Sequence, residues 1–162
     1  MQNNEVKESI WADGVPQNVD ESFKITQLEL LNMAVKQVVE NYAIPNGFKV
    51  EGVNAQLGVF PNIILKRNDV IYAILAIPFV YPQYLYINDE VRLEMVKFVK
   101  SYNGIPLFAP IGFRSTDKDR AEASMMLKGD TFETLFKGFI KLTDAEHQDL
   151  VNVEDQFILL EE

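Results

Sequence analysis

The sequence contains no cysteine and only one histidine, His147, among its 162 residues. The absence of cysteine excludes disulfide bonds, thiolate metal sites and nucleophilic cysteine chemistry, and it leaves the redox compartment undecided. A single histidine excludes a metal site built from several imidazoles. His147 stands in an acidic segment, where a solvated side chain is commoner than a general base. The chain also lacks a phosphate-binding glycine loop and a nucleophile elbow, so we expect no cofactor and no bound metal.

Long apolar runs and positive charge are scarce as well. No uninterrupted apolar stretch reaches the roughly 20 residues of a membrane span, and no apolar run follows a basic N-terminus. Acidic residues number 24 against 15 lysines and arginines, which gives a formal net charge of −9. A field of this sign repels polyanions. We therefore expect a soluble, cytoplasmic protein that contacts neither membranes nor nucleic acid.

What the chain does have is enough apolar sequence for one compact domain, since 48% of its residues are hydrophobic. Residues 1–22 are polar and acidic with little periodicity, apart from the pair Ile10 and Trp11, and predict a flexible leader. Residues 23–150 are expected to form the globular domain. Residues 151–162 form an acidic tail with four large apolar residues.

Two helices are predicted from capping signals. Thr26, followed three positions later by Glu29, forms a capping-box pattern before an apolar stripe at helical spacing. Asn88, followed by two acidic residues, predicts the start of a second helix. The inner face of this second helix is expected to comprise Val91, Met95, Phe98, Val99 and Tyr102.

Strands are predicted over residues 48–57, in a hairpin over residues 62–77, and over residues 105–113. The hairpin turns at Asn68 and Asp69, and its second half is apolar on both faces, as in a central strand. Pro106 and Pro110 mark the last strand as an edge or short element. Because the second helix joins the hairpin to this strand, we expect a right-handed parallel crossover between them.

The C-terminal part predicts further helices. Residues 115–128 suggest a short helix, and the apolar residues between Phe132 and Ile140 fit one helical face, with Gly138 as its weak point. Thr143 and Glu146 repeat the capping-box spacing for a last helix. The expected fold is therefore α/β, in the mixed α+β sense: a central mixed sheet of about four strands flanked by helices, with extra C-terminal helices.

The order helix, strand, hairpin, helix, strand, with Pro61 leading the second strand, resembles the PD-(D/E)XK nuclease superfamily and its restriction-endonuclease-like core. The resemblance covers roughly residues 26–113. In that family an aspartate follows the proline, and an acidic residue, any residue and a lysine follow about a dozen positions later. The carboxylates hold magnesium and the lysine helps to activate water. An acidic residue on the first helix often completes the metal site.

This sequence departs from the family pattern at its functional positions. Asn62 stands where the aspartate is expected, and Leu75 and Ile77 stand where the acidic residue and the lysine are expected. An amide lacks the anionic charge that draws a hard cation, and the two aliphatic side chains offer no ligand. Glu29 or Glu40 corresponds to the helix carboxylate.

These departures predict a catalytically inactive nuclease-like domain with a structural or protein-binding role. The alternative is a divergent metal-dependent nuclease whose ligands have moved to neighbouring elements. Two or more carboxylates and a lysine converging at the mouth of the hairpin would favour that alternative.

The acidic tail carries Phe157, Ile158, Leu159 and Leu160. Apolar surface of this size gains several kcal/mol from burial, at about 25 cal/mol per Å². We expect the four residues to be covered in one of two ways. They pack on their own domain as an extra strand or turn, or they bind a second copy or another protein through a sheet edge.

Overall fold

The structure, a computed structural model, describes residues 21–82, 87–150 and 154–160. Its helical elements are η1 (Glu21–Phe23), α1 (Gln27–Val38), η2 (Val39–Ala43), α2 (Asp89–Lys100) and α3 (Lys118–Glu122). Its strands are β1 (Lys49–Val53), β2 (Ile63–Arg67), β3 (Val70–Val80), β4 (Ile105–Ser115), β5 (Phe132–Leu135), β6 (Phe139–Lys141) and β7 (Phe157–Ile158). The leader residues Ile10 and Trp11 lie outside the described residues.

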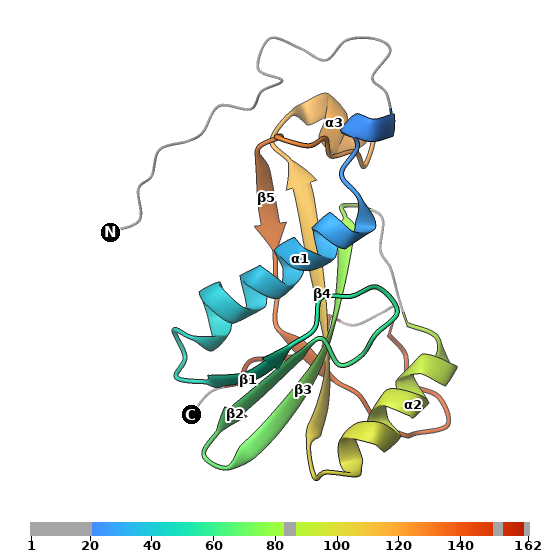
Figure 1. Cartoon of the computed structure of the whole chain (residues 1–162). Helices are drawn as coiled ribbons and strands as arrows, with labels where there is room; N and C mark the ends of the chain where they lie inside the picture. Colours follow the sequence, from blue (N-terminus) through green and yellow to red (C-terminus); the bar gives the residue numbers. More distant parts are fainter. Residues whose placement is uncertain (1–20, 83–86, 151–153, 161–162) are drawn as a thin grey trace.

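The strands form one mixed sheet in the order β1-β2-β3-β4-β6-β7, with β5 paired to β4 beside this path (Figure 1). All of these pairings are antiparallel except the one between β3 and β4, which is parallel as the crossover through α2 predicts. The fold is α+β. The expectation of about four strands is wrong, because the described part of the chain contributes seven strands to the sheet.

The helices α1 and α2 cover opposite faces of the sheet. Ile74 and Ala76 of β3 belong to the core that contains α1, whereas Ala73 and Leu75 belong to the core that contains α2. Alternate residues of a strand point to opposite faces, so this division places one helix on each side. β3 is therefore buried on both faces, as its continuous apolar sequence predicts.

The predicted starts of the first two helices are confirmed. The Thr26 hydroxyl accepts a hydrogen bond from the Glu29 amide at 3.1 Å, and the Glu29 carboxylate accepts from the Thr26 amide and hydroxyl. Asn88 caps α2 by accepting from the Val91 amide at 2.9 Å. The predicted inner face of α2 is partly wrong. Phe98 is 52% exposed, and the buried stripe comprises Arg92, Met95, Val96 and Val99.

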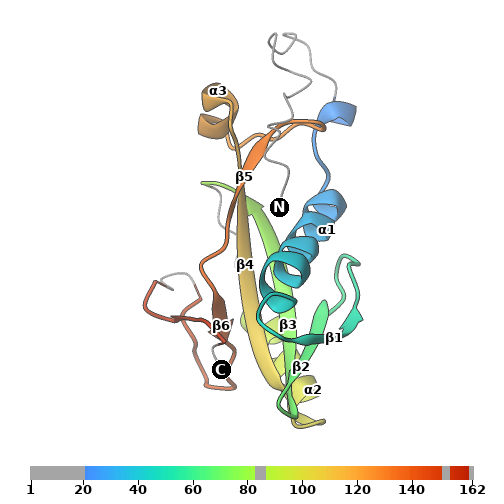
Figure 2. The same cartoon turned by 90° about the vertical axis from the view of Figure 1, so that its left-hand side faces the viewer.

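The strand β4 corrects a second prediction, because it is an interior strand of eleven residues despite its two prolines. The carbonyl of Pro106 accepts from Leu142, so the backbone of Pro106 faces away from β3. By strand alternation Pro110 faces the same side. On that side of β4 the pairing with β6 ends at Phe108 and the pairing with β5 begins at Gly112, so neither proline interrupts a ladder. Figure 2 shows β5 and β6 beside different parts of β4.

The predicted C-terminal helices are largely wrong. Residues 132–140 form β5 and β6 instead of a helix, and residues 143–150 are not helical; only α3, within the expected short helix, is present. Gly138 has φ 128°, and a Cβ atom there would lie 2.7 Å from the Ile158 carbonyl oxygen. Glycine at this position lets the chain turn between two strands that both pair with β4, which a local helical pattern cannot indicate.

Part of the tail packs on its own domain, as in the first of the two predicted arrangements. Phe157 and Ile158 pair with β6, and Leu160 is only 9% exposed. Ile158 and Leu159 remain 40% and 54% exposed, so the expectation that all four side chains are covered is wrong for these two. The Leu160 amide donates to the Tyr42 hydroxyl at 2.7 Å, and its carbonyl accepts from Arg67 at 3.1 Å. Across the described ranges, no helix is both long and apolar enough to cross a membrane.

Candidate functional site

Asn62, at the position of the family's aspartate, is buried at the start of β2 and is only 2% exposed. Its side-chain nitrogen donates to the carbonyl oxygens of Asn54 and Val59, at 3.0 and 3.2 Å. Its side-chain oxygen accepts from the Ala76 amide at 2.9 Å. The backbone of Asn62 adds two more bonds, to Asn54 and to Ile74. The residue therefore fixes the segment of residues 54–61 to β3.

This environment requires an amide. The two carbonyl oxygens need a donor, whereas the Ala76 N–H needs an acceptor, and only a carboxamide supplies both in one planar group. An ionised carboxylate would point an anionic oxygen at two carbonyls. Asn62 is thus a structural residue, which donates both side-chain N–H groups to carbonyl oxygens and accepts from the Ala76 amide.

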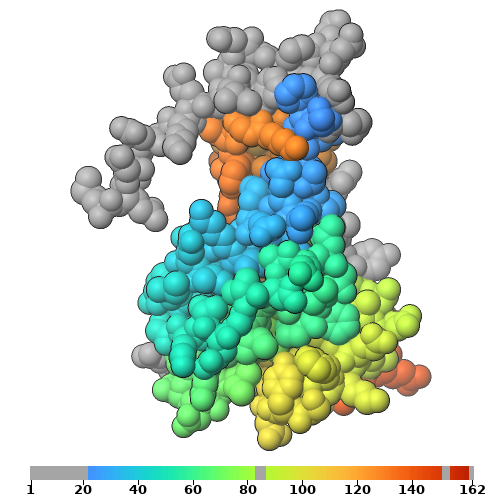
Figure 3. Space-filling view, in the orientation of Figure 1, coloured from blue at the N-terminus to red at the C-terminus, as the bar shows by residue number. Residues whose placement is uncertain are grey.

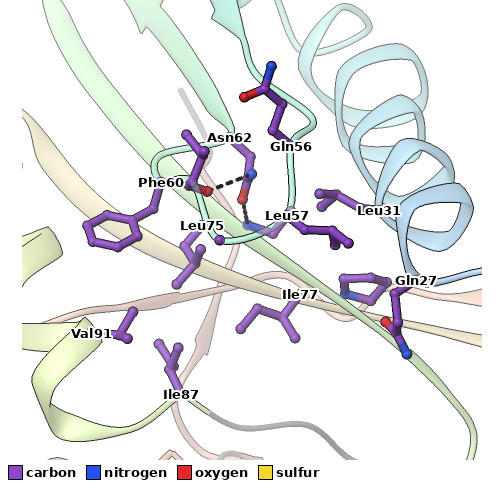
Figure 4. Close-up of a pocket in the computed structure, with 14 residues that line it drawn as sticks. Gln27, Leu31, Gln56, Leu57, Phe60, Asn62, Leu75, Ile77, Ile87 and Val91 are labelled. Carbon is purple, nitrogen blue, oxygen red and sulfur yellow. Dashed lines mark hydrogen bonds between the residues drawn. The ribbon is translucent and has the colours of Figure 1, made fainter.

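Leu75 and Ile77, at the positions of the missing acidic residue and lysine, border an apolar pocket of about 280 Å³. Residues 56–60 form one wall, α1 forms a second through Leu31, and the start of α2 forms a third (Figure 4). Figure 3 shows the β1–β2 segment at the surface between α1 and α2. The residues around the pocket are Gln27, Leu31, Gln56, Leu57, Gly58, Val59, Phe60, Asn62, Leu75, Ala76, Ile77, Pro78, Ile87 and Val91.

None of the described residues that line the pocket is charged. Its polar side chains are Asn62, which is fully bonded, and Gln27 and Gln56, which are exposed. The convergence of carboxylates and a lysine that would favour a relocated nuclease site is not found in this lining. Burial of an apolar group is the interaction that such a surface favours.

The helix carboxylates do not reach this pocket. Glu29 belongs to the capping box and lies 3.6 Å from the Lys128 ammonium. The hydrogen bond from the Thr26 hydroxyl, with a smaller contribution from Lys128, lowers the pKa of Glu29 below its usual value. Glu40 is exposed in η2. A search of the described ranges found no group of three or more histidines, aspartates or glutamates that could hold a metal ion.

A buried ion pair that sequence reasoning missed lies at the far end of β4. Asp130, whose side chain is fully buried, accepts from Arg120 Nε at 2.7 Å, from Arg120 Nη2 at 2.8 Å and from the Ser115 hydroxyl at 2.8 Å. The hydrogen bond to Asp130 raises the pKa of the Arg120 guanidinium. With its carboxylate bonded on both oxygens, this cluster anchors α3 and the following loop to β4 and has no free group for chemistry.

A second charged group inside the fold is Arg92, which is completely buried on α2. Its guanidinium donates to the Thr143 carbonyl and to the Asp89 carboxylate, the latter at 3.1 Å. Its Nε has no hydrogen-bond partner among the described residues. Arg92 thereby holds the segment after β6 against α2. No hydrophobic pattern could have placed a charged residue on the inner face of this helix.

A wider, polar depression of about 550 Å³ lies beside β5 and α3. Arg114 on its wall is paired with Glu133 and lies over the Tyr81 ring, 5.7 Å from the centroid. The hydrogen bond with Glu133 raises the pKa of Arg114. Lys118 lines the depression as well, but so do Glu122 and Glu133, and the two positive charges of the described lining are matched by two negative ones. The depression therefore has no excess of positive charge that would favour an anion.

Comparisons with known proteins bear on the family. A search of curated proteins and a search of solved structures each found no match. A protein-family model matches residues 28–142, which extend from α1 to β6 and include most of the pocket. The match covers more than half of the chain, and the chain therefore belongs to the family described as Domain of unknown function (DUF8840).

Proposed function

We propose that this chain is a non-catalytic, protein-binding domain, in which the positions of the nuclease motif build an apolar pocket. One observation carries the proposal: the Asn62 carboxamide is fully used in holding the pocket wall, and Leu75 and Ile77 border the pocket itself. Side chains that would bind and activate water around a metal are replaced by groups that favour burial of an apolar partner.

The alternative, a divergent nuclease with relocated ligands, receives less support. Such an enzyme needs at least two oxygen ligands from carboxylates close together near the scissile phosphate. Glu29 is committed to capping α1, Glu40 is exposed in η2, and neither lines the pocket.

Calorimetric titration of the full chain with Mg²⁺ and with Mn²⁺ tests the proposal. We expect no saturable binding at micromolar metal and no cleavage of single- or double-stranded DNA or RNA. Micromolar binding that is lost in Glu29→Gln or Glu40→Gln would refute the proposal and favour the nuclease. Glu146→Gln, a change at an exposed position outside α1 and η2, serves as the matched control.

A further inference from the structure

The rim of the apolar pocket is exposed. Leu57 and Val59, which lie at its mouth, are 57% and 36% exposed. Its volume of about 280 Å³ lies below the usual range of about 300–1,000 Å³ for sites that enclose drug-sized ligands. This volume is sufficient for one large side chain, and the exposed rim would gain from contact with the chain that carries this side chain.

Negative charge borders this apolar surface on the α2 side. Val91 lines the pocket, Glu90 precedes it, and Glu94 lies one helical turn further on the same surface. Both glutamates are exposed, and neither forms an ion pair within the described ranges. Among the described lining residues there is no lysine or arginine that could neutralise them.

Charge selects among the occupants of such a pocket. The chain's own leader, residues 1–22, carries five acidic residues and one basic residue, and a second copy of the chain carries a net charge of −9. Both would bring negative charge to an acidic rim, which is unfavourable. A segment with positive charge beside its apolar anchor would be attracted.

We propose that the pocket binds one bulky aliphatic side chain of a partner protein, in a segment with lysine or arginine on both sides of that side chain. The proposal rests on the protein-binding function and specifies its partner. The aliphatic side chain fills the space between Leu75, Ile77 and Val91, and the flanking cations lie near Glu90 and Glu94. Apolar burial supplies affinity, and the charges supply selectivity and a faster encounter.

Short fluorescein-labelled peptides with a central leucine flanked by lysines provide the probe, measured by fluorescence anisotropy with the full chain. One comparison peptide carries serine in place of leucine, and another carries glutamate in place of each lysine. We expect binding only by the first peptide. Glu90→Gln and Glu94→Gln should each weaken it about twofold to fivefold at low ionic strength, less in high salt. Glu40→Gln, in η2 and outside the pocket lining, should leave the binding unchanged.

Variants of the pocket separate site-specific binding from attraction to an acidic surface. Ile77→Phe adds volume inside the pocket, and Leu57→Ser removes apolar surface from the rim at an exposed position that does not support the fold. Both should reduce binding of the leucine peptide, and thermal melting verifies that each variant is folded. Should Ile77→Phe fail to fold, Leu57→Ser alone decides the question.

The inference is overturned if the serine peptide binds as well as the leucine peptide, or if Leu57→Ser leaves binding unchanged. Tighter binding of the acidic peptide also overturns it, as does saturable binding of a synthetic peptide of residues 1–22. A random-peptide selection against the full chain distinguishes failure of the proposed partner chemistry from failure of the protein-binding function. Pocket-dependent peptides without basic residues would refute the partner chemistry and leave the protein-binding function standing. Metal binding in the calorimetric test would refute the function itself.

Discussion

Replacing Asn62 with aspartate restores the residue that the nuclease pattern expects, and we predict that it destabilises the protein. The change removes the donor to the Asn54 and Val59 carbonyls and keeps the acceptor for the Ala76 amide. A buried acceptor left without its donor costs about 1–3 kcal/mol. Both carbonyls belong to a surface segment that water can reach after small movements, so the lower half of this range applies to each. We expect a loss of about 2–4 kcal/mol at neutral pH.

The loss should depend on pH with a definite sign. Burial and the two facing carbonyls disfavour the charged form of the introduced carboxyl, which raises its pKa above the unfolded value of about 3.9. Between these two values the native state binds more protons than the unfolded state. The stability of Asn62→Asp relative to wild type therefore falls as pH rises from about 4 through the raised pKa, and is constant above it.

Urea denaturation followed by far-UV circular dichroism at several pH values measures both effects. Asn54→Asp is the matched control, since it makes the same chemical change on an exposed side chain, and it should alter stability by less than about 0.5 kcal/mol. If Asn62→Asp and Asn54→Asp unfold at the same urea concentration, and their difference is independent of pH, the structural role assigned to Asn62 is wrong.

Other perturbations test the remaining contacts. Asp130→Asn breaks a buried ion pair and should cost about 3–5 kcal/mol in urea denaturation. Leu160→Ala should lower the unfolding free energy by about 2–3 kcal/mol, with no change of mass in light scattering, because the tail packs on its own domain. Thr26→Ala should cost about 1 kcal/mol and return the pKa of Glu29 toward its usual value in an NMR titration. Since that pKa is lowered in the fold, the carboxylate's contribution is present above the unfolded pKa and is lost as pH falls through the folded one.

The first two of these predictions have a control inside the chain. Lys137→Ala breaks an exposed ion pair and should be nearly neutral beside Asp130→Asn. Leu159→Ala changes a side chain that is 54% exposed and should cost far less than Leu160→Ala. A shift from dimer to monomer in Leu160→Ala, with the fold retained, would instead favour the tail as an interface. An unchanged pKa of Glu29 in Thr26→Ala would contradict the capping box as the cause of the shift.

Local signals predicted the elements that depend on local contacts. Thr26 and Asn88 predict the starts of their helices because a capping side chain and its amide partner lie within three residues of each other. The long apolar run from Val70 likewise indicates a strand covered on both faces. The short strands β5 and β6 escaped prediction because their hydrogen bonds reach back to β4, more than 20 residues earlier in most of the pairs. Apolar spacing in this segment satisfies a helix equally well.

At the pocket, too, sequence predicted part of the arrangement and not the part that depends on distant contacts. The nuclease pattern points to Asn62, Leu75 and Ile77, and all three residues line one pocket in the structure. The roles of these residues depend on where the carbonyls of Asn54 and Val59 lie, and a loop conformation has no periodic signal in sequence. Sequence alone could not relate Glu90 to the pocket, because that relation depends on where α2 packs in the fold.

On one side of β4, a gap at Pro110 lies between the pairing with β6 and the pairing with β5. We expect the parts of the domain on the two sides of this gap to unfold with different free energies. The segment that contains α3 and β5 is joined to the sheet through the last residues of β4 and through Asp130. Its remaining backbone contacts among the described residues are to residues 23–25, through the bridge between Lys24 and Leu127. No continuous ladder connects β5 with β6 along that side of β4. Opening of this segment can therefore proceed as a local unfolding event while β1 to β4, and the pocket that they support, keep their protection against amide hydrogen exchange.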